Sequence, residues 1–252
     1  NDVAYPITTD KGYMKVKVPL NFFVDGKALN EKVLLKSTDG TLSAISHVMT
    51  DTHVTLNLKQ AGTFVFAEPN VVFNDIDKLS TKEEVLYLAN RQIIKGKDVG
   101  VFDPHAEITR AQFARMISRA LGLVPSDAEV PFTDVRGKDY AKDVQALYEA
   151  GITTGKTATT FDPQGTVTRQ QAALIMKRIL KYAEIDTAAI TANTNFKDAN
   201  KMSKEVLEAV GLLNSLDIMT GNTEREFMPA GHLTRSHMAK ILKRTLGVAE
   251  LM

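Results

Sequence analysis

Two short segments within the first 70 residues alternate between apolar and polar side chains with a period of two. Residues 14–18 and 54–58 show this alternation, and residues 33–35 and 64–66 are short apolar runs of the kind found in strands. A period of two places every second side chain on the same face of a strand. The pattern predicts five or six strands in a small β-sandwich-like module. Two Asp-Gly pairs between these runs are turn signals typical of hairpins: Asp25-Gly26 and Asp39-Gly40.

From Phe73 onward the apolar positions follow a helical period, and one pattern occurs three times. Each copy opens with Phe-x-Asp and continues through a helical segment to a glycine, with Val, Leu and Ile at fixed distances before that glycine. Recurrence of the same order and spacing indicates a tandem repeat. The Asp and Gly residues of the three copies are Asp75 and Gly96, Asp134 and Gly155, and Asp198 and Gly221.

The second half of each copy holds a Phe-x-Pro motif, a Thr-Arg pair and a second helical segment with one apolar stripe. A two-helix unit with a single stripe cannot bury it alone, so three units should pack their stripes around a shared axis. We therefore expect an α+β chain of several domains. A β module at 1–70 is followed by an all-α pseudo-threefold trimer of helix-loop-helix repeats at 71–125, 130–185 and 194–252.

Composition and charge exclude several classes of protein. The chain has 31 Lys and Arg residues against 30 Asp and Glu residues and no cysteine. The balanced charge argues against nucleic-acid binding, and the absence of cysteine excludes disulfides and thiolate zinc sites. No apolar stretch is long enough for membrane insertion. The chain begins Asn1-Asp2-Val3 without an export signal, so either it never carried one or it is a mature or trimmed product.

The Thr-Arg pairs are the strongest candidates for binding chemistry. Each threonine is placed to cap the second helix, and at Thr109 and Thr168 a Gln follows at capping-box spacing. The arginine then occupies the first helical position, where the helix dipole disfavours a cation by roughly 0.3 to 1 kcal/mol. A cation repeated at an unfavourable position needs a partner. The three arginines are Arg110, Arg169 and Arg235.

Two partners are open for these arginines. A guanidinium beside exposed helix N-terminal amides is suited to binding a carboxylate ligand. The alternative is an internal salt bridge to the Asp of the Phe-x-Asp motif. Because a first-turn Arg→Ala change should remove no core contact, we expect each such substitution to leave folding nearly intact.

The repeated Asp and Gly residues have both structural and binding interpretations. Asp75, Asp134 and Asp198 precede helical segments, so they suit turns or caps, or contacts to sugar hydroxyls. The repeated glycines suit a left-handed helix stop, and the missing Cβ would also let a sugar approach the backbone. Five scattered histidines form no helix-spaced pair, so we expect no metal site and no cofactor. No catalytic motif is supported by its context, which argues against an enzyme.

The motifs Phe-x-Asp, Phe-x-Pro and Ile-Thr-Arg-Ala-Gln, in three copies, resemble the S-layer homology domain. The resemblance implies a three-pronged pseudo-threefold helical trimer that binds secondary cell wall polysaccharide in grooves between repeats. In that family the polymer is acidic and commonly carries a pyruvate ketal on N-acetylmannosamine. The family motif usually ends in Glu, and this chain has Gln112, Gln171 and His237 there. Residues 12–66 also resemble the small β module that often precedes such triplets.

The resemblance implies noncovalent anchoring of a secreted surface protein to the peptidoglycan-associated wall. The repeated arginines, aspartates and glycines would then bind the polysaccharide. An alternative function is a lattice or scaffold interface that holds S-layer neighbours together.

Overall fold

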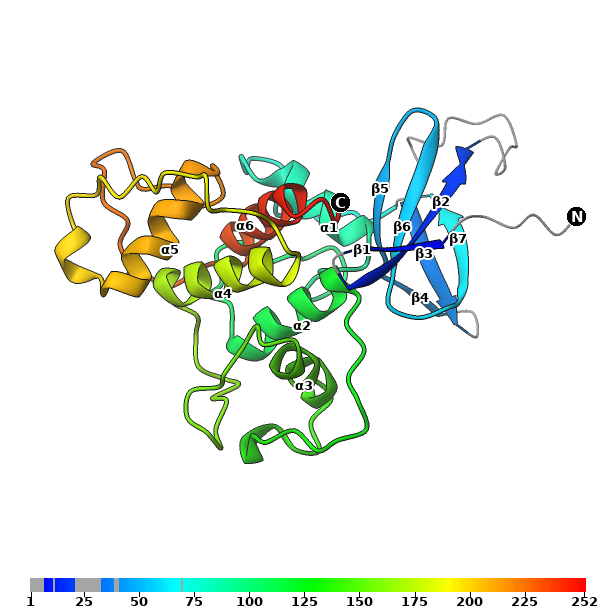
Figure 1. Ribbon diagram of the computed structural model, residues 1–252, viewed down its shortest axis with the longest axis horizontal. Coiled ribbons are helices and arrows are strands. Elements are labelled where there is room, and N and C mark those ends of the chain that lie inside the picture. The colour runs from blue at the N-terminus through cyan, green and yellow to red at the C-terminus, as the bar shows by residue number, and fades with distance from the viewer. Residues whose placement is uncertain (1–6, 11, 21–32, 39–40, 69) are drawn as a thin grey trace, which may run out of the picture.

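The computed structural model describes residues 7–10, 12–20, 33–38, 41–68 and 70–252. Within them, seven strands precede six α-helices, which confirms the expected α+β class. Figure 1 shows the strands gathered in one module and the helices arranged in three lobes beside it.

The strands form two antiparallel sheets. The four-stranded sheet has the order β1-β2-β6-β5 and the three-stranded sheet the order β4-β3-β7. Apolar residues Val54, Leu56 and Leu58 of β6 are buried with Val18 and Ile45. The strands are β1 (Ile7–Asp10), β2 (Tyr13–Pro19), β3 (Val33–Thr38), β4 (Thr41–Ser43), β5 (Ser46–Met49), β6 (His53–Leu58) and β7 (Thr63–Ala67).

The predicted count of five or six strands is wrong for the described residues, which hold seven. The added strands β1, β4 and β5 have three or four residues each, too few for a period of two to be visible. The predicted turns Asp25-Gly26 and Asp39-Gly40 lie outside the described residues. Antiparallel pairing of Thr38 with Thr41 nevertheless makes β3 and β4 a hairpin.

The main helix pairs join neighbouring repeats. The second helix of each repeat packs against the first helix of the next: α2 against α3, α4 against α5, and α6 back against α1. The three lobes in Figure 1 are these pairs. The helices are α1 (Lys82–Asn90), α2 (Arg110–Leu121), α3 (Ala141–Glu149), α4 (Arg169–Tyr182), α5 (Lys204–Ser215) and α6 (Arg235–Val248), with 3-10 turns at Thr133–Val135 and Ala199–Lys201.

A ring of three backbone hydrogen bonds lies at the centre of the repeats. The N–H of Ile108 donates to Leu233 O at 2.9 Å, that of Leu233 to Val167 O at 2.9 Å, and that of Val167 to Ile108 O at 3.1 Å. Each of these residues immediately precedes a Thr-Arg pair and is at most 1% exposed. The ring closes the repeats head to tail around one axis, so each Thr-Arg step faces the neighbouring repeat.

The β module is fixed to the helical trimer by buried polar contacts. The Tyr13 hydroxyl donates to Leu121 O at 2.9 Å, and the Ser46 hydroxyl donates to Leu251 O at 2.6 Å. Lys59 places its ammonium 3.8 Å from the centre of the Tyr13 ring. Tyr13 therefore belongs to the core of the helical trimer although it is a residue of strand β2.

Candidate functional site

Each Thr-Arg step begins a helix and docks it on the next repeat. Thr109 and Thr168 form the predicted capping boxes with Gln112 and Gln171, which confirms that assignment. Thr234 accepts from the N–H of His237 in the same position.

The first amides of these helices are already bonded. The N–H of Arg110 donates to Gly165 O at 2.9 Å and that of Ala111 to Pro163 O at 3.0 Å. The other two helices make the same pair of bonds to the loop of the following repeat. The expectation of exposed helix N-terminal amides is therefore wrong. The first N–H groups of these helices, which have no partner within the helix, donate to carbonyls of the neighbouring repeat.

The arginine side chains bridge the same boundary. Arg110, Arg169 and Arg235 each donate from Nε to the carbonyl of the Phe-x-Pro phenylalanine in the next repeat, at 2.7, 2.7 and 2.8 Å. Each guanidinium also lies over that ring, with its carbon 4.6 to 4.7 Å from the centroid. The acceptors are Phe161, Phe227 and Phe102, respectively.

The three arginines are not equally buried. Arg235 is 6% exposed, and its second donor, Nη2, reaches Lys95 O at 2.7 Å. Arg169 makes the matching bond to Thr220 O at 2.8 Å. The sequence-based premise that these arginines contact no core element is therefore wrong, since each one links two repeats.

The repeated aspartates bond to the Phe-x-Pro loops and not to the arginines. Asp134 accepts from the N–H groups of Phe161 and Asp162, and Asp198 accepts from those of Phe227 and Met228, at 2.7 to 3.1 Å. Asp75 does the same, and although burial opposes it, the two backbone donors hold the pKa of its carboxyl below the ordinary value.

Among the described residues no ion pair joins these aspartates to the three arginines. They are still close enough to act electrostatically. Burial lowers the pKa of each guanidinium, and carboxylates of the next repeat oppose that shift. These are Asp162 and then Asp134 for Arg110, Asp198 for Arg169, and Asp103 and then Asp75 for Arg235. Instead of a direct salt bridge, each arginine donates to a backbone carbonyl of the Phe-x-Pro loop, and the aspartate accepts from backbone N–H groups of the same loop.

The repeated glycines make room for the Phe-x-Asp phenylalanines. A Cβ on Gly96 would lie 2.8 Å from Phe73 Cε1, and one on Gly221 would lie 3.0 Å from Phe196 Cε1. Gly155 has a φ of +78°, but the other two have no left-handed φ, so the predicted left-handed stop holds at one repeat only. Close approach of an aromatic ring is the shared requirement.

Three equivalent hollows lie at the boundaries between repeats. We name them the α2, α4 and α6 grooves after the helix that lines each, with volumes of about 450, 520 and 370 Å³. Each combines the arginine of the preceding repeat with the repeated glycine of its own. The α2 groove holds Arg235 and Gly96, the α4 groove Arg110 and Gly155, and the α6 groove Arg169 and Gly221. Asp75, Asp134 and Asp198 line none of these three.

The position that departs from the family motif also lines the grooves, through Gln112, Gln171 and His237. Burial, followed by the charges of Arg169 and Lys240, lowers the pKa of His237. All three groove residues are therefore uncharged at neutral pH.

A further arginine lines every groove and comes from the helix that names it: Arg119, Arg178 and Arg244. Each lies nine residues after the Thr-Arg arginine of its own repeat, which lines a different groove. Sequence reasoning missed these residues, because a cation on the polar side of an amphipathic helix is ordinary. Alignment of the three helices would have found them, since all three copies carry Arg there. Carbonyl oxygens hold two of them in place: Arg178 Nη1 lies 3.3 Å from Ile152 O, and Arg244 Nη1 lies 2.6 Å from Asp217 O.

Each groove has an excess of positive charge although the whole chain is nearly neutral. Five cationic side chains face two carboxylates in the α2 groove, and three face one in each of the other two. Such hollows suit an anionic ligand with several hydrogen-bonding groups.

The sequence matches the S-layer homology domain at residues 72–114, 131–173 and 195–239. The chain belongs to this family. It is 35% identical to an endoglucanase of Bacillus sp. (strain KSM-635) over 175 residues, which cover 69% of this chain and 18% of that enzyme. It is 30% identical over 165 residues to the S-layer protein sap of Bacillus anthracis, covering 65% of this chain and 20% of the relative. An amylopullulanase of Thermoanaerobacterium thermosulfurigenes is 29% identical, over 75% of this chain and 10% of the enzyme.

Membership of this family makes the chain a cell-wall-associated module that anchors proteins at the cell surface. The matches span a tenth to a fifth of these relatives' own length. No helix in the described part of the chain is long and apolar enough to cross a membrane. The described residues also contain no group of three side chains that could hold a metal ion.

Proposed function

We propose that the chain anchors an exported protein by binding an acidic, pyruvylated secondary wall polysaccharide in its three inter-repeat grooves. The observation that carries the proposal is that each groove is lined by arginines from two neighbouring repeats: Arg235 with Arg119, Arg110 with Arg178, and Arg169 with Arg244. Arg110, Arg169 and Arg235 stay protonated and donate from Nε to a carbonyl, and Arg169 and Arg235 also donate from Nη2. The remaining N–H donors of each guanidinium are left for a carboxylate. A pyruvate ketal presents such a carboxylate.

The repeated glycines support this function indirectly. Because the ring of the Phe-x-Asp phenylalanine takes the space of a Cβ, the backbone beside Gly96, Gly155 and Gly221 stays open to the groove. Three similar sites on one chain raise its avidity for a repeating polymer well above the affinity of one groove. We propose a purely binding, non-enzymatic role, because the feature that all three grooves share is a set of arranged cations.

The test is cosedimentation with three preparations of wall sacculi: intact, stripped of secondary polymer, and carrying polymer without the ketal. The expected result is binding to intact walls alone. A triple variant, Arg119→Gln, Arg178→Gln and Arg244→Gln, should lose most of that binding, since it removes one cation from each groove. Arg136→Gln is the matched control, because Arg136 is exposed and lines none of the three grooves.

Equal recovery with all three wall preparations would overturn the ketal-specific mechanism. The second candidate, a lattice or scaffold interface between protein copies, would then be favoured. It predicts concentration-dependent assembly in the absence of glycan, which sedimentation velocity measures directly.

A further inference from the structure

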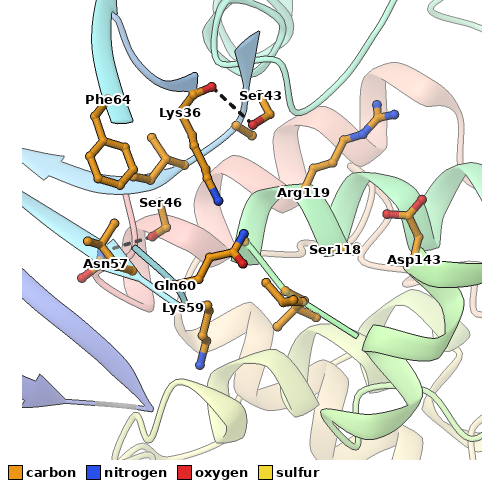
Figure 2. Close-up of a pocket in the computed structure, with 16 residues that line it drawn as sticks. Lys36, Ser43, Ser46, Asn57, Lys59, Gln60, Phe64, Ser118, Arg119 and Asp143 are labelled. Atoms are coloured by element: carbon orange, nitrogen blue, oxygen red, sulfur yellow. Dashed lines mark hydrogen bonds between the residues drawn. The ribbon is translucent and has the colours of Figure 1, made fainter. Parts of the chain in front are cut away.

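A fourth hollow lies outside the three grooves, where the β module meets the helical trimer. Its volume is about 300 Å³, at the lower end of the range for small-molecule sites. Strands and loops of the β module supply one wall, and the C-terminal end of α2 supplies the other (Figure 2). We call it the intermodule pocket. Its polar and aromatic lining includes Lys36, Ser43, Asn57, Gln60, Phe64, Ser118, Arg119 and Asp143.

Several polar groups of this pocket have unused hydrogen-bonding capacity. Asn57 is 3% exposed, and its Oδ1 has no partner among the described residues. Within the same part of the chain, no hydrogen bond or ion pair engages the Lys36 ammonium or the Gln60 side-chain amide. Figure 2 shows both groups directed toward the middle of the pocket. Gln60 is exposed and Lys36 is half-buried, so both unpaired donors are accessible to a polar occupant of the pocket.

The pocket continues the α2 groove. Arg119 lines both hollows, so they are separated by one side chain of α2. Gly122 lines the pocket in a left-handed conformation with a φ of 59°, and a Cβ there would meet no atom within 4 Å. The helix end is therefore open on the side of the pocket. Arg119 is the residue shared by the two hollows, and a chain of linked sugars seated in the α2 groove would extend along it toward the β module.

We infer that the intermodule pocket is a second subsite of the α2 groove, which takes a neighbouring sugar residue of the same acidic glycan. This inference rests on the proposed function. Lys36 is the counter-charge for an acidic substituent, and Gln60 is a partner for hydroxyl or amide groups. Phe64 offers an aromatic face to the apolar side of the sugar ring. The β module is then part of the binding surface and makes the α2 groove longer than the other two.

The test compares a short ligand with a long one on the full chain. The short ligand is the methyl glycoside of pyruvylated N-acetylmannosamine, and the long ligand is wall polymer released and separated into fragments of several repeat units. The variant combines Lys36→Met with Gln60→Ala. Methionine keeps the aliphatic packing of Lys36 over Gly62, where a Cβ would lie 2.8 Å from Lys36 Cε. Lys17→Met is the matched control, because Lys17 is exposed on β2 and does not line the pocket.

Calorimetry should give the same affinity of the short ligand for the wild type, the double variant and the control. The long fragments should bind the double variant about tenfold more weakly than the other two proteins, as expected when hydrogen bonds to a charged group are lost. Equal affinity of the long fragments for all three proteins would overturn the subsite and leave the grooves standing. If neither ligand binds the wild type, the proposed function falls and the subsite falls with it.

Discussion

Replacing each bridging arginine by alanine tests whether these residues hold the repeats together. Arg235→Ala removes two hydrogen bonds, to Phe102 O and Lys95 O, from a side chain that is 6% exposed. Hydrogen bonds from a charged donor contribute about 1.5 to 3 kcal/mol each, and the abandoned carbonyls add a cost. Removing the positive charge from the first helical position, where the helix dipole disfavours it, stabilises the fold by about 0.3 to 1 kcal/mol and partly offsets this loss. We therefore expect Arg235→Ala to lower the free energy of unfolding by about 3 kcal/mol.

The other two arginines give a graded series. Arg169 makes the same two bonds but is half-buried, so Arg169→Ala should cost about 2 kcal/mol. Arg110 has one such bond, to Phe161 O, and Arg110→Ala should cost about 1 kcal/mol. Arg136→Ala is the control. Its ion pair with Glu129 joins side chains that are 45% and 70% exposed, and exposed pairs are worth about 0.2 to 1 kcal/mol.

Urea unfolding followed by circular dichroism measures the series, and thermal melts check it. For a chain of this size 1 kcal/mol corresponds to a shift of about 2 to 4 °C in Tm, so Arg235→Ala should melt roughly 6 to 12 °C below the wild type. Losses below about 0.5 kcal/mol for all three variants, the range of ordinary surface changes, would refute the bridging role. An equal loss at all three positions would refute the link between stability and the number of carbonyl contacts.

Three further predictions concern other parts of the chain. Burial lowers the pKa of His47 to about 4, so the unfolded chain takes up the proton first as pH falls through about 6.5. The free energy of unfolding of the wild type should therefore fall by about 2 kcal/mol between pH 7.5 and pH 5 because of this group. His47→Gln should lack that decrease in urea titrations at the two pH values. Gly155→Ala should lower the free energy of unfolding by about 3 kcal/mol or more in the same assay, because a Cβ would overlap the Phe132 ring at a left-handed φ. Gly247→Ala should raise it by up to about 1 kcal/mol, because a Cβ there would meet no atom within 4 Å. Tyr13→Phe deletes the buried bond to Leu121 O and should lower thermal stability by about 1 kcal/mol, and an unchanged melt would show that this bond does not hold the modules together.

Local features of the repeats were predictable from sequence, because their partners lie a few residues away. The capping boxes at Thr109 and Thr168 depend on a Gln three residues later, and both are present. The helical stripes follow from a period that each segment displays on its own. The arginine partners were out of reach, since the bond from Arg235 to Phe102 O spans 133 residues and closes the last repeat on the first.

The junction between the modules was equally hidden. Tyr13 is the first residue of a strand with an ordinary period-two pattern, and nothing near it in sequence shows that its hydroxyl meets the end of α2. The intermodule pocket depends on that junction. Its residues come from β3 to β7 and from two helices that are about 60 to 100 residues away in sequence.

The third repeat departs from the others at a strained backbone position. In the first two repeats a left-handed residue after the Phe is Asp103 or Asp162, with φ of 58° and 60°, and each pairs with a lysine at 2.6 or 2.7 Å. In the third repeat Met228 has φ of 59° and is 51% exposed, and Asn222 stands in the lysine position. Left-handed backbone costs an ordinary L-residue about 1 to 2 kcal/mol, and Asp tolerates it better than Met.

Met228→Asp should therefore raise the free energy of unfolding by about 1 kcal/mol. Asn222 is kept, because its Oδ1 accepts from the N–H groups of Glu224 and Glu226 at 3.0 and 2.9 Å. The reverse change in the second repeat, Asp162→Met, should lower the free energy of unfolding by a similar amount, and thermal melts of both variants measure the two effects. An unchanged melt for both would contradict the strain argument. A stabilised variant that binds walls more weakly would mean that the thioether of Met228, which lines the α6 groove, contributes to binding there at the expense of stability.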